Sequence, residues 1–278
     1  MKRVIVLAIG GIFLTAGVAL ATPPGPGFPF DCSDGGTTSC ATDDTGCVSE
    51  TSAQLKCSSM IGKAFSKALS MAAKCHMKQA TMRFQGTSET GAGTAEENCE
   101  SNPGNSAKSV LDATLAKLAS AGICAPVQLA NAAAQEAVLF GAGPTSLDGQ
   151  NGNVYCDASS TVLIGDDDPG WVAADAGMLK CEITVAKALD KLVVFGAKCH
   201  DKMNAAFFKG KDFDEETCEM TDPISTKGAL DKFNKVRDKL AHLGICPPCL
   251  DSVALDTLAA NAINALDAGN ASTYPCGL

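Results

Sequence analysis

The chain has 278 residues, of which 46% are hydrophobic and only 5% are aromatic, and its formal net charge is −9. This acidic balance argues against nucleic acid or an anionic membrane as the partner of the whole surface. The 14 cysteines, all of them after residue 31, indicate an exported protein whose modest core is supplemented by disulfides.

The first 21 residues have the pattern of a secretory signal. Lys2 and Arg3 precede an apolar run from Val4 to Leu20, and Ala19-Leu20-Ala21 is a small-x-small cleavage site. A transmembrane anchor is the alternative, because the run is nearly long enough to span a bilayer. We expect cleavage, which leaves 20 basic and 31 acidic residues in a secreted or periplasmic protein with no further membrane span.

The rest of the chain contains an internal repeat. Residues 43–86 and 167–210 are identical at 17 of 44 positions, at a constant offset of 124 residues. A stretch rich in Pro, Gly, Ser and Thr precedes the first copy and is predicted to be an irregular arm. The predicted organisation is an arm, a first unit, a linker and a second unit, at residues 22–42, 43–157, 158–166 and 167–278.

Each unit is predicted to contain three helices. The long helix, residues 55–86 and 179–210 in the two copies, has a lysine face opposite an apolar face at the helical period. A polar loop carrying Cys99 follows the first copy. The middle and third helices of the two units are predicted at residues 106–121, 126–140, 225–243 and 248–266. The expected fold class is all-α, with two tandem disulfide-stapled three-helix units.

The repeat also constrains the disulfides. Cys57 and Cys75 are about 27 Å apart along one helix, too far for one bridge. If the middle helix returns antiparallel, Cys124 meets Cys57 and Cys99 meets Cys75. The predicted pairs by this logic are Cys57–Cys124, Cys75–Cys99, Cys181–Cys246 and Cys199–Cys218. For the remaining cysteines we expect Cys249–Cys276, Cys47–Cys156 and Cys32–Cys40.

A Cys-His pair occurs in both long helices, as Cys75-His76 and Cys199-His200. Each looks like a covalent haem motif without its first cysteine. The favoured interpretation is a half-buried histidine that hydrogen-bonds a carbonyl or carboxylate and locks the helix in place. The alternative is a haem or metal carrier that uses His76 and His200.

Enzymatic motifs are weak. Adjacent residues on a helix point about 100° apart, so neither Cys-His pair suits a catalytic dyad. Cys246-Pro247-Pro248-Cys249 resembles a thioredoxin-type motif, but the strand and helix context of those oxidoreductases is missing. The sequence therefore predicts a protein that is not an enzyme and that has no cofactor, haem being the alternative.

Two charged patterns remain. The lysine faces could bind an anionic polymer or an acidic envelope protein, although such faces are usually just solvated. They consist of Lys56, Lys63, Lys67, Lys74 and Lys78, and of Lys180, Lys187, Lys191, Lys198 and Lys202. The acidic clusters Asp43-Asp44 and Asp166-Asp167-Asp168 lack the spacing of a Ca²⁺ loop, and we interpret them as acids at helix starts.

The repeated pattern of Lys-Cys, about 17 residues, Cys-His and a later Gly-Ile-Cys resembles that of exported Cys-rich helical-repeat proteins of deltaproteobacterial type. This resemblance covers both units and implies an envelope or extracellular setting, with no activity attached. We therefore expect a non-enzymatic binding or structural component of the cell envelope or extracellular space.

Overall fold

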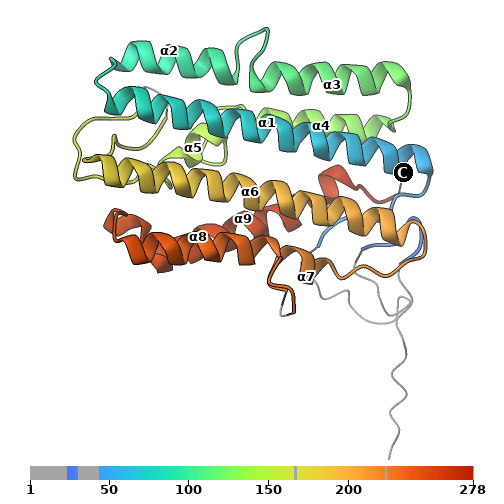
Figure 1. The fold of residues 1–278 in the computed structure, drawn as a ribbon. Helices are drawn as coiled ribbons and strands as arrows, with labels where there is room; N and C mark the ends of the chain where they lie inside the picture. The colour runs from blue at the N-terminus through green and yellow to red at the C-terminus, as the bar shows by residue number, and fades with distance from the viewer. Residues whose placement is uncertain (1–23, 31–43, 166–167, 223, 278) are drawn as a thin grey trace, which may run out of the picture.

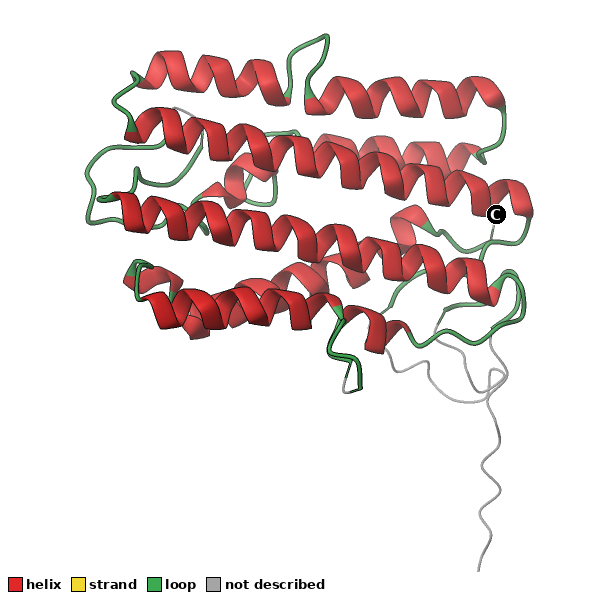
Figure 2. Ribbon diagram, in the orientation of Figure 1, coloured by secondary structure: helices red, strands yellow, loops and turns green. Residues whose placement is uncertain are grey.

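A computed structural model describes residues 24–30, 44–165, 168–222 and 224–277. Every element of regular secondary structure in this part of the chain is a helix, which confirms the all-α class (Figure 2). The first five are α1 (Ser52–Phe84), α2 (Glu89–Glu100), α3 (Ala107–Ala121), α4 (Pro126–Leu139) and α5 (Leu147–Asn151). The others are α6 (Ala176–Phe207), α7 (Glu215–Glu219), α8 (Ala229–Leu243), the short 3₁₀ helix η1 (Pro248–Leu250) and α9 (Ser252–Thr273). The expected signal, residues 1–21, lies outside the described residues.

Local signals set the starts of the two long helices. At α1 the Thr51 hydroxyl accepts from the Gln54 amide while the Gln54 side chain accepts from the Thr51 amide, a reciprocal capping box. At α6 the Asp175 carboxylate accepts from the amides of Gly177 and Met178. These caps satisfy amides that have no partner within the helix, so both helices begin three residues before the predicted starts.

Helices α1 and α6 lie antiparallel in the middle of the molecule (Figure 1). The Ser59 hydroxyl donates to Asp201 at 3.2 Å, and the Ser70 hydroxyl donates to Asp190 at 2.6 Å. The two residue numbers of each pair add up to 260, as an antiparallel register requires. The carboxyl end of each long helix therefore lies beside the amino end of the other.

Shorter helices cover this central pair. Helices α2 and α3 follow one another along α1, while α8 and α9 pack against α6 (Figure 1). One apolar cluster joins α1, α3 and α4, around Ile61 and Leu111, and another joins α6, α8 and α9, around Leu192 and Phe233. Contacts between α4 and α9 link the two sets of helices behind the central pair.

The segments in front of the two long helices have matching roles. The Cys47 amide donates to the Tyr274 carbonyl at 2.9 Å, and the Trp171 amide donates to the Tyr155 carbonyl at 2.8 Å. The segment before α1 thus packs at the end of α9, and the segment before α6 packs beside α5. The segment that precedes the long helix in each half of the chain, which we call its leading segment, thus packs against the C-terminal part of the other half.

Some predicted boundaries are wrong. The loop predicted around Cys99 is the helix α2, which begins with the Ser88 hydroxyl accepting from the Gly91 amide. Helix α8 begins at Ala229 rather than residue 225, and α9 continues to Thr273, beyond the predicted end at residue 266. The glycines of α2 and the polar residues late in α9 hid helices that tertiary contacts stabilise.

Every cysteine in the described part of the chain forms a disulfide. Four of these bonds join the pairs predicted from an antiparallel middle helix, namely Cys57–Cys124, Cys75–Cys99, Cys181–Cys246 and Cys199–Cys218. Such bonds are typical of an oxidising compartment. None of the helices in the described residues combines the length and the hydropathy that a bilayer span requires.

Two predicted disulfide pairings are wrong. Cys47 bonds Cys276 and Cys156 bonds Cys249, instead of the expected Cys47–Cys156 and Cys249–Cys276. The physical reason is the exchange of leading segments, because the segment before α1 packs at the end of α9 and places Cys47 beside Cys276. The expected Cys32–Cys40 bond lies outside the described residues.

Candidate metal centres

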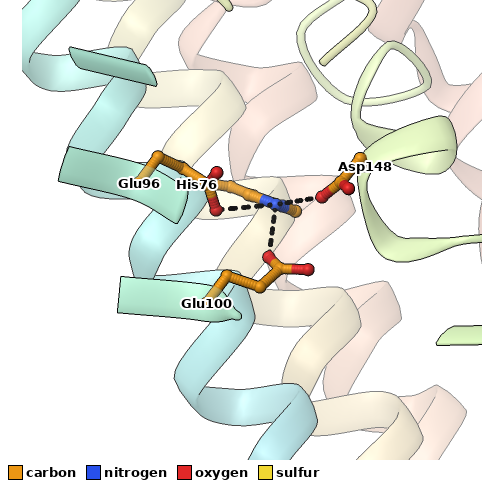
Figure 3. Close-up of side chains that lie close together, drawn as sticks. All are labelled: His76, Glu96, Glu100 and Asp148. Atoms are coloured by element: carbon orange, nitrogen blue, oxygen red, sulfur yellow. Dashed lines mark hydrogen bonds and ion pairs between the residues drawn. The ribbon is translucent and has the colours of Figure 1, made fainter. Parts of the chain in front are cut away.

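The His76 side chain lies in a cluster of carboxylates, which we call the His76 site (Figure 3). The distances from its Nε2 atom are 2.9 Å to Glu100 Oε2, 3.3 Å to Glu96 Oε1, 3.3 Å to Asp148 Oδ1 and 3.8 Å to Asp168 Oδ1. These five residues come from α1, α2, α5 and the segment before α6. The site therefore forms only when parts distant in sequence have packed together.

Helix geometry explains how α2 supplies two carboxylates. Glu96 and Glu100 are four residues apart, so their side chains lie on the same face of α2. Cys99, which lies between them, bonds Cys75, the neighbour of His76 on α1. The disulfide thus holds the two glutamates opposite the histidine. Because cysteine and histidine are adjacent on the helix, the disulfide and the carboxylate cluster lie side by side.

The second cluster, the His200 site, has the same composition. The distances from His200 Nε2 are 3.2 Å to Asp44 Oδ1, 3.5 Å to Glu215 Oε1, 3.6 Å to Glu219 Oε2 and 3.3 Å to Asp267 Oδ1. Here the ligand-bearing elements are α6, α7, α9 and the segment before α1. The disulfide Cys199–Cys218 occupies the place of Cys75–Cys99.

The two sites exchange one aspartate. Asp168 leads into α6 but lies at the His76 site on α1, and Asp44 leads into α1 but lies at the His200 site on α6. At offset 124 these two aspartates are counterparts, as are the two histidines. Because α1 and α6 are antiparallel, the sites lie towards opposite ends of the molecule, near α5 and α7 (Figure 1).

The sites contain more buried acceptors than their histidines can satisfy. A histidine Nε2 can donate only one hydrogen bond, yet carboxylate oxygens of four residues surround it in each site. Several buried oxygens make no hydrogen bond of good geometry in the described structure, although five of them lie 2.9–3.8 Å from a histidine Nε2. They are both carboxylate oxygens of Glu96, Glu100 Oε2, Asp168 Oδ1, Glu215 Oε1, Glu219 Oε1 and Asp267 Oδ1. Buried carboxylates that share a single histidine nitrogen are costly, so the arrangement calls for a positive charge at each centre.

Burial and mutual repulsion change the ionisation of these groups. Burial is the main cause that raises the pKa of Glu96 to about 7, that of Asp168 to about 7 and that of Glu215 to about 9. Burial alone would lower the pKa of His200. The opposing effect of Asp267 and Glu219 is larger, so the pKa is raised to about 10. The ligand-free sites therefore retain protons to limit their negative charge.

The donor set suits a transition-metal cation. One imidazole nitrogen with carboxylate oxygens is a mixed ligand set that binds Mn²⁺, Fe²⁺ or Zn²⁺, whereas Ca²⁺ and Mg²⁺ prefer oxygen alone. Ligand atoms of His76, Glu96, Glu100 and Asp148 lie within 4.8 Å of one another. Two ligand atoms on opposite sides of one such ion, each about 2.1 Å from the metal, are about 4.2 Å apart. Small side-chain movements would therefore bring these atoms into coordination distance of a single ion.

In the His200 site, ligand atoms fall within the same 4.8 Å limit in two overlapping groups that share the histidine. One contains Asp44 and Glu215, and the other contains Glu219 and Asp267. This site is therefore somewhat wider than the His76 site, with the same kinds of donors.

The structure bears on the haem alternative through the thiols. Cys75 and Cys199 are both in disulfides, so the sulfur atoms that a haem thioether would need are already bonded. Both histidines are buried and face carboxylates. His76 Nε2 makes the predicted hydrogen-bond contact, at 3.3 Å to Asp148 Oδ1, whereas His200 Nε2 lies at ion-pair distances from its carboxylates and has no hydrogen bond of good geometry. The attachment chemistry of haem is not compatible with the two disulfides.

The interpretation of the acidic clusters as helix-start acids is wrong for two of their members. Helix α1 begins at Ser52 and α6 at Ala176, so Asp44 and Asp168 lie too far from the helix ends to act on their dipoles. Asp43, Asp166 and Asp167 lie outside the described residues.

All ten lysines of the two predicted lysine faces are exposed. Among them, Lys63 lies 3.7 Å from Asp201, and Lys202 lies over the Phe195 ring. The structure does not bring these lysines into either site.

Sequence reasoning missed the glutamates. Glu96-Glu97-Asn98-Cys99-Glu100 recurs as Glu215-Glu216-Thr217-Cys218-Glu219, at an offset of 119 rather than 124. Asp148 and Asp267 follow the same offset of 119. This repeated Glu-Glu-x-Cys-Glu pattern was the available signal.

The fold and the two sites define a class of protein: an all-α, disulfide-rich chain with a pair of buried histidine-carboxylate clusters. No protein-family model matches the chain, and the searches of curated proteins and of solved structures found no match.

Proposed function

We propose that this protein is an exported, non-enzymatic metal-binding protein that holds one first-row transition-metal ion in each histidine-carboxylate site. The observation that carries the proposal is that one imidazole nitrogen faces four carboxylate groups, three of them on buried residues, and that this arrangement occurs twice. Both copies of the repeat contain the same five side chains, one histidine, two glutamates and two aspartates, which supports a shared ligand.

Charge balance supports a metal ion over a purely structural cluster. If all four carboxylates were ionised, each site would have a charge of −4, which a protonated histidine would reduce only to −3. Without a cation, the raised pKa values of Glu96, Asp168 and Glu215 keep protons on some of these groups instead. A divalent cation compensates more of this charge than the single proton of an imidazolium, and it accepts several ligands at once. The buried oxygens that make no hydrogen bond are then coordinated by the ion.

The disulfides and the N-terminal sequence support an exported setting. Disulfides form and persist in oxidising compartments, and a structural metal site in such a compartment needs ligands that resist oxidation. Carboxylates and imidazole meet this requirement. We place the protein in the periplasm or outside the cell, as a binding component of the envelope or extracellular space.

Metal stoichiometry tests the proposal. The protein exported with its disulfides formed is stripped with a chelator, reloaded separately with Zn²⁺, Mn²⁺ or Fe²⁺ (the latter without oxygen), desalted and analysed by elemental mass spectrometry. We expect two equivalents for at least one of these ions. The variants His76→Ala and His200→Ala should each retain one equivalent.

The third histidine supplies the matched control. His242 is exposed on α8 and belongs to neither carboxylate cluster, so His242→Ala should still bind two equivalents. Less than one equivalent in the wild-type protein, or equal loss in all three variants, would contradict the proposal. Stronger retention of Ca²⁺ than of the transition metals would show that the imidazole is not a ligand.

A further inference from the structure

We infer that the His76 site exchanges its metal ion with solvent, whereas the His200 site retains its ion as a structural centre. This inference rests on the proposed function and deepens it. The two sites share their ligand types, so the argument depends on how each is enclosed.

The exposure of the ligands differs between the sites. The Asp148 side chain is 20% exposed, whereas that of its counterpart Asp267 is 4% exposed. In the His200 site the most exposed ligand side chain is that of Asp44, at 7%. The His76 site is therefore open at one ligand, and the His200 site is covered on all sides.

A cavity explains the exposure of Asp148. Its volume is about 560 Å³, and Glu100 and Asp148 of the His76 site form part of its wall. Residues 140–144, in the loop that joins α4 to α5, also line it. Two of the five ligands thus border a space that is far larger than the volume of one water molecule. A metal ion at this site can keep a coordinated water and can be reached by a small oxygen-donor ligand.

A difference in chain length produces this cavity. Pro126 and Asp148 are separated by 22 positions, whereas Pro248 and Asp267 are separated by 19. The three extra residues interrupt the helix, so α4 ends at Leu139 and α5 begins at Leu147, while α9 runs unbroken through Asp267.

The interrupting loop also folds back on α5. A Cβ atom on Gly149 would collide with the carbonyl oxygen of Gly143, so the loop lies directly against the residue that follows Asp148. The loop and α5 together form the rim of the cavity, which the continuous helix α9 has no room to form at the other site.

Chelator challenge tests the inference. The protein loaded with two equivalents of Zn²⁺ is mixed with excess diethylenetriaminepentaacetate, and bound zinc is measured by elemental analysis after rapid desalting. We expect two phases of equal amplitude. Release from a covered site requires local opening of the fold, so the fast phase should be at least about tenfold faster than the slow one.

Variants assign the phases. His200→Ala should leave only the fast phase, and His76→Ala should leave only the slow one. Removal of Gly143 to Thr145 restores the spacing of the His200 site and should slow the fast phase while two equivalents remain bound. The same experiments with His242→Ala should match the wild-type protein.

The outcomes separate this inference from the proposed function. Two bound equivalents released at one common rate, or a fast phase that belongs to the His200 site, would overturn the inference and leave the proposed function intact. A wild-type protein that binds no metal would overturn both. If Asp148→Asn folds like the wild-type protein and releases zinc from the His76 site faster, the result would support the role of this exposed ligand. An unchanged release rate would oppose it.

Discussion

The two ends of the molecule contain the same set of five side chains, one histidine, two glutamates and two aspartates, in different surroundings. At both ends a histidine late in a long helix meets two glutamates of a short helix, an aspartate near the end of the unit and an aspartate from the other unit. The loops around the sites differ in length, and one end has a cavity that exposes Asp148. Both copies of the repeat therefore have the same ligand side chains, and they differ in how accessible these side chains are to solvent.

The cores beside the sites differ as well. On α1 the Ser58 hydroxyl donates to the Thr273 carbonyl at 2.8 Å and accepts from Gln128 Nε2 at 2.9 Å. Its counterpart on α6 is Glu182, a fully buried carboxyl whose two oxygens have no hydrogen-bond partner among the described residues. Equivalent helix positions thus carry a satisfied polar group in one half and an unsatisfied acid in the other.

The largest expected effect is an increase in the free energy of unfolding when metal binds at both ends of the molecule. An ion that binds only the folded state at a thousandfold excess over its Kd adds about 4 kcal/mol per site, or about 8 kcal/mol for both. Each site also joins the start of one long helix to the end of the other. We expect the unfolding free energy, measured by urea titration without reductant, to fall by this order when metal is chelated.

Variants divide this stabilisation between the ends. His76→Ala and His200→Ala should each lose about half of the metal-dependent part, and His242→Ala should lose none. A larger loss in His200→Ala would indicate that the covered site binds more tightly. Identical unfolding curves with metal and with chelator would contradict a stabilising role at either end.

A smaller effect should follow from the unsatisfied acid. Burial raises the pKa of Glu182 to about 8, and the negative charge of Asp157 adds to this shift. In an unfolded chain a glutamate has a pKa of about 4.3, so between these two values the folded state binds more protons than the unfolded state. Stability contributed by this group is therefore lost as the pH rises from about 4.3 to about 8.

Glu182→Gln removes this titration. The variant should unfold with a free energy on the order of a few kcal/mol above the wild-type value at pH 8.5, and with a similar value near pH 5. Urea titrations of chelated protein at a series of pH values would measure the difference. Glu50→Gln, at an exposed glutamate, is the control and should follow the wild type. Parallel pH profiles for Glu182→Gln and the wild type would show that Glu182 stays ionised in the fold.

The sequence predicted the scaffold because the signals are local. Helical periodicity identified the long helices, and five turns of separation along one helix prevented Cys57 from bonding Cys75. An antiparallel return then defined four disulfides. The two wrong pairings share one cause, since the exchange of leading segments that moves Cys47 to Cys276 is a tertiary feature with no local signal.

The sites were only half predictable. The Cys-His pairs stood out because they recur at a constant offset, but the glutamates recur five residues out of step and lie in a Gly-rich stretch that resembles a loop. A search of the repeat with gaps would have found Glu-Glu-x-Cys-Glu. Even so, Asp44 and Asp168 could not have been assigned to their sites, because each serves the histidine of the other unit.

The smallest effect concerns how each exchanged aspartate is held. At the His76 site Gln79 Nε2 donates to Asp168 Oδ2 at 2.7 Å, and both side chains are buried. The counterpart of Gln79 on α6 is Met203, which cannot donate. Asp44 accepts instead from Asn270 Nδ2, at a longer 3.3 Å.

Gln79→Met gives the His76 site the residue of the other end. Partners that hold a metal ligand in place typically contribute 10- to 100-fold in affinity, and the remaining ligands of this site stay in position, so we expect about tenfold weaker binding there. Competition with a fluorescent chelator would measure it, and the affinity of the His200 site serves as the internal reference. Met203→Gln should leave both affinities unchanged, because Asp44 already has its donor. An unchanged affinity in Gln79→Met would mean that packing alone positions Asp168, and the two ends would then differ in access but not in how they hold their ligands.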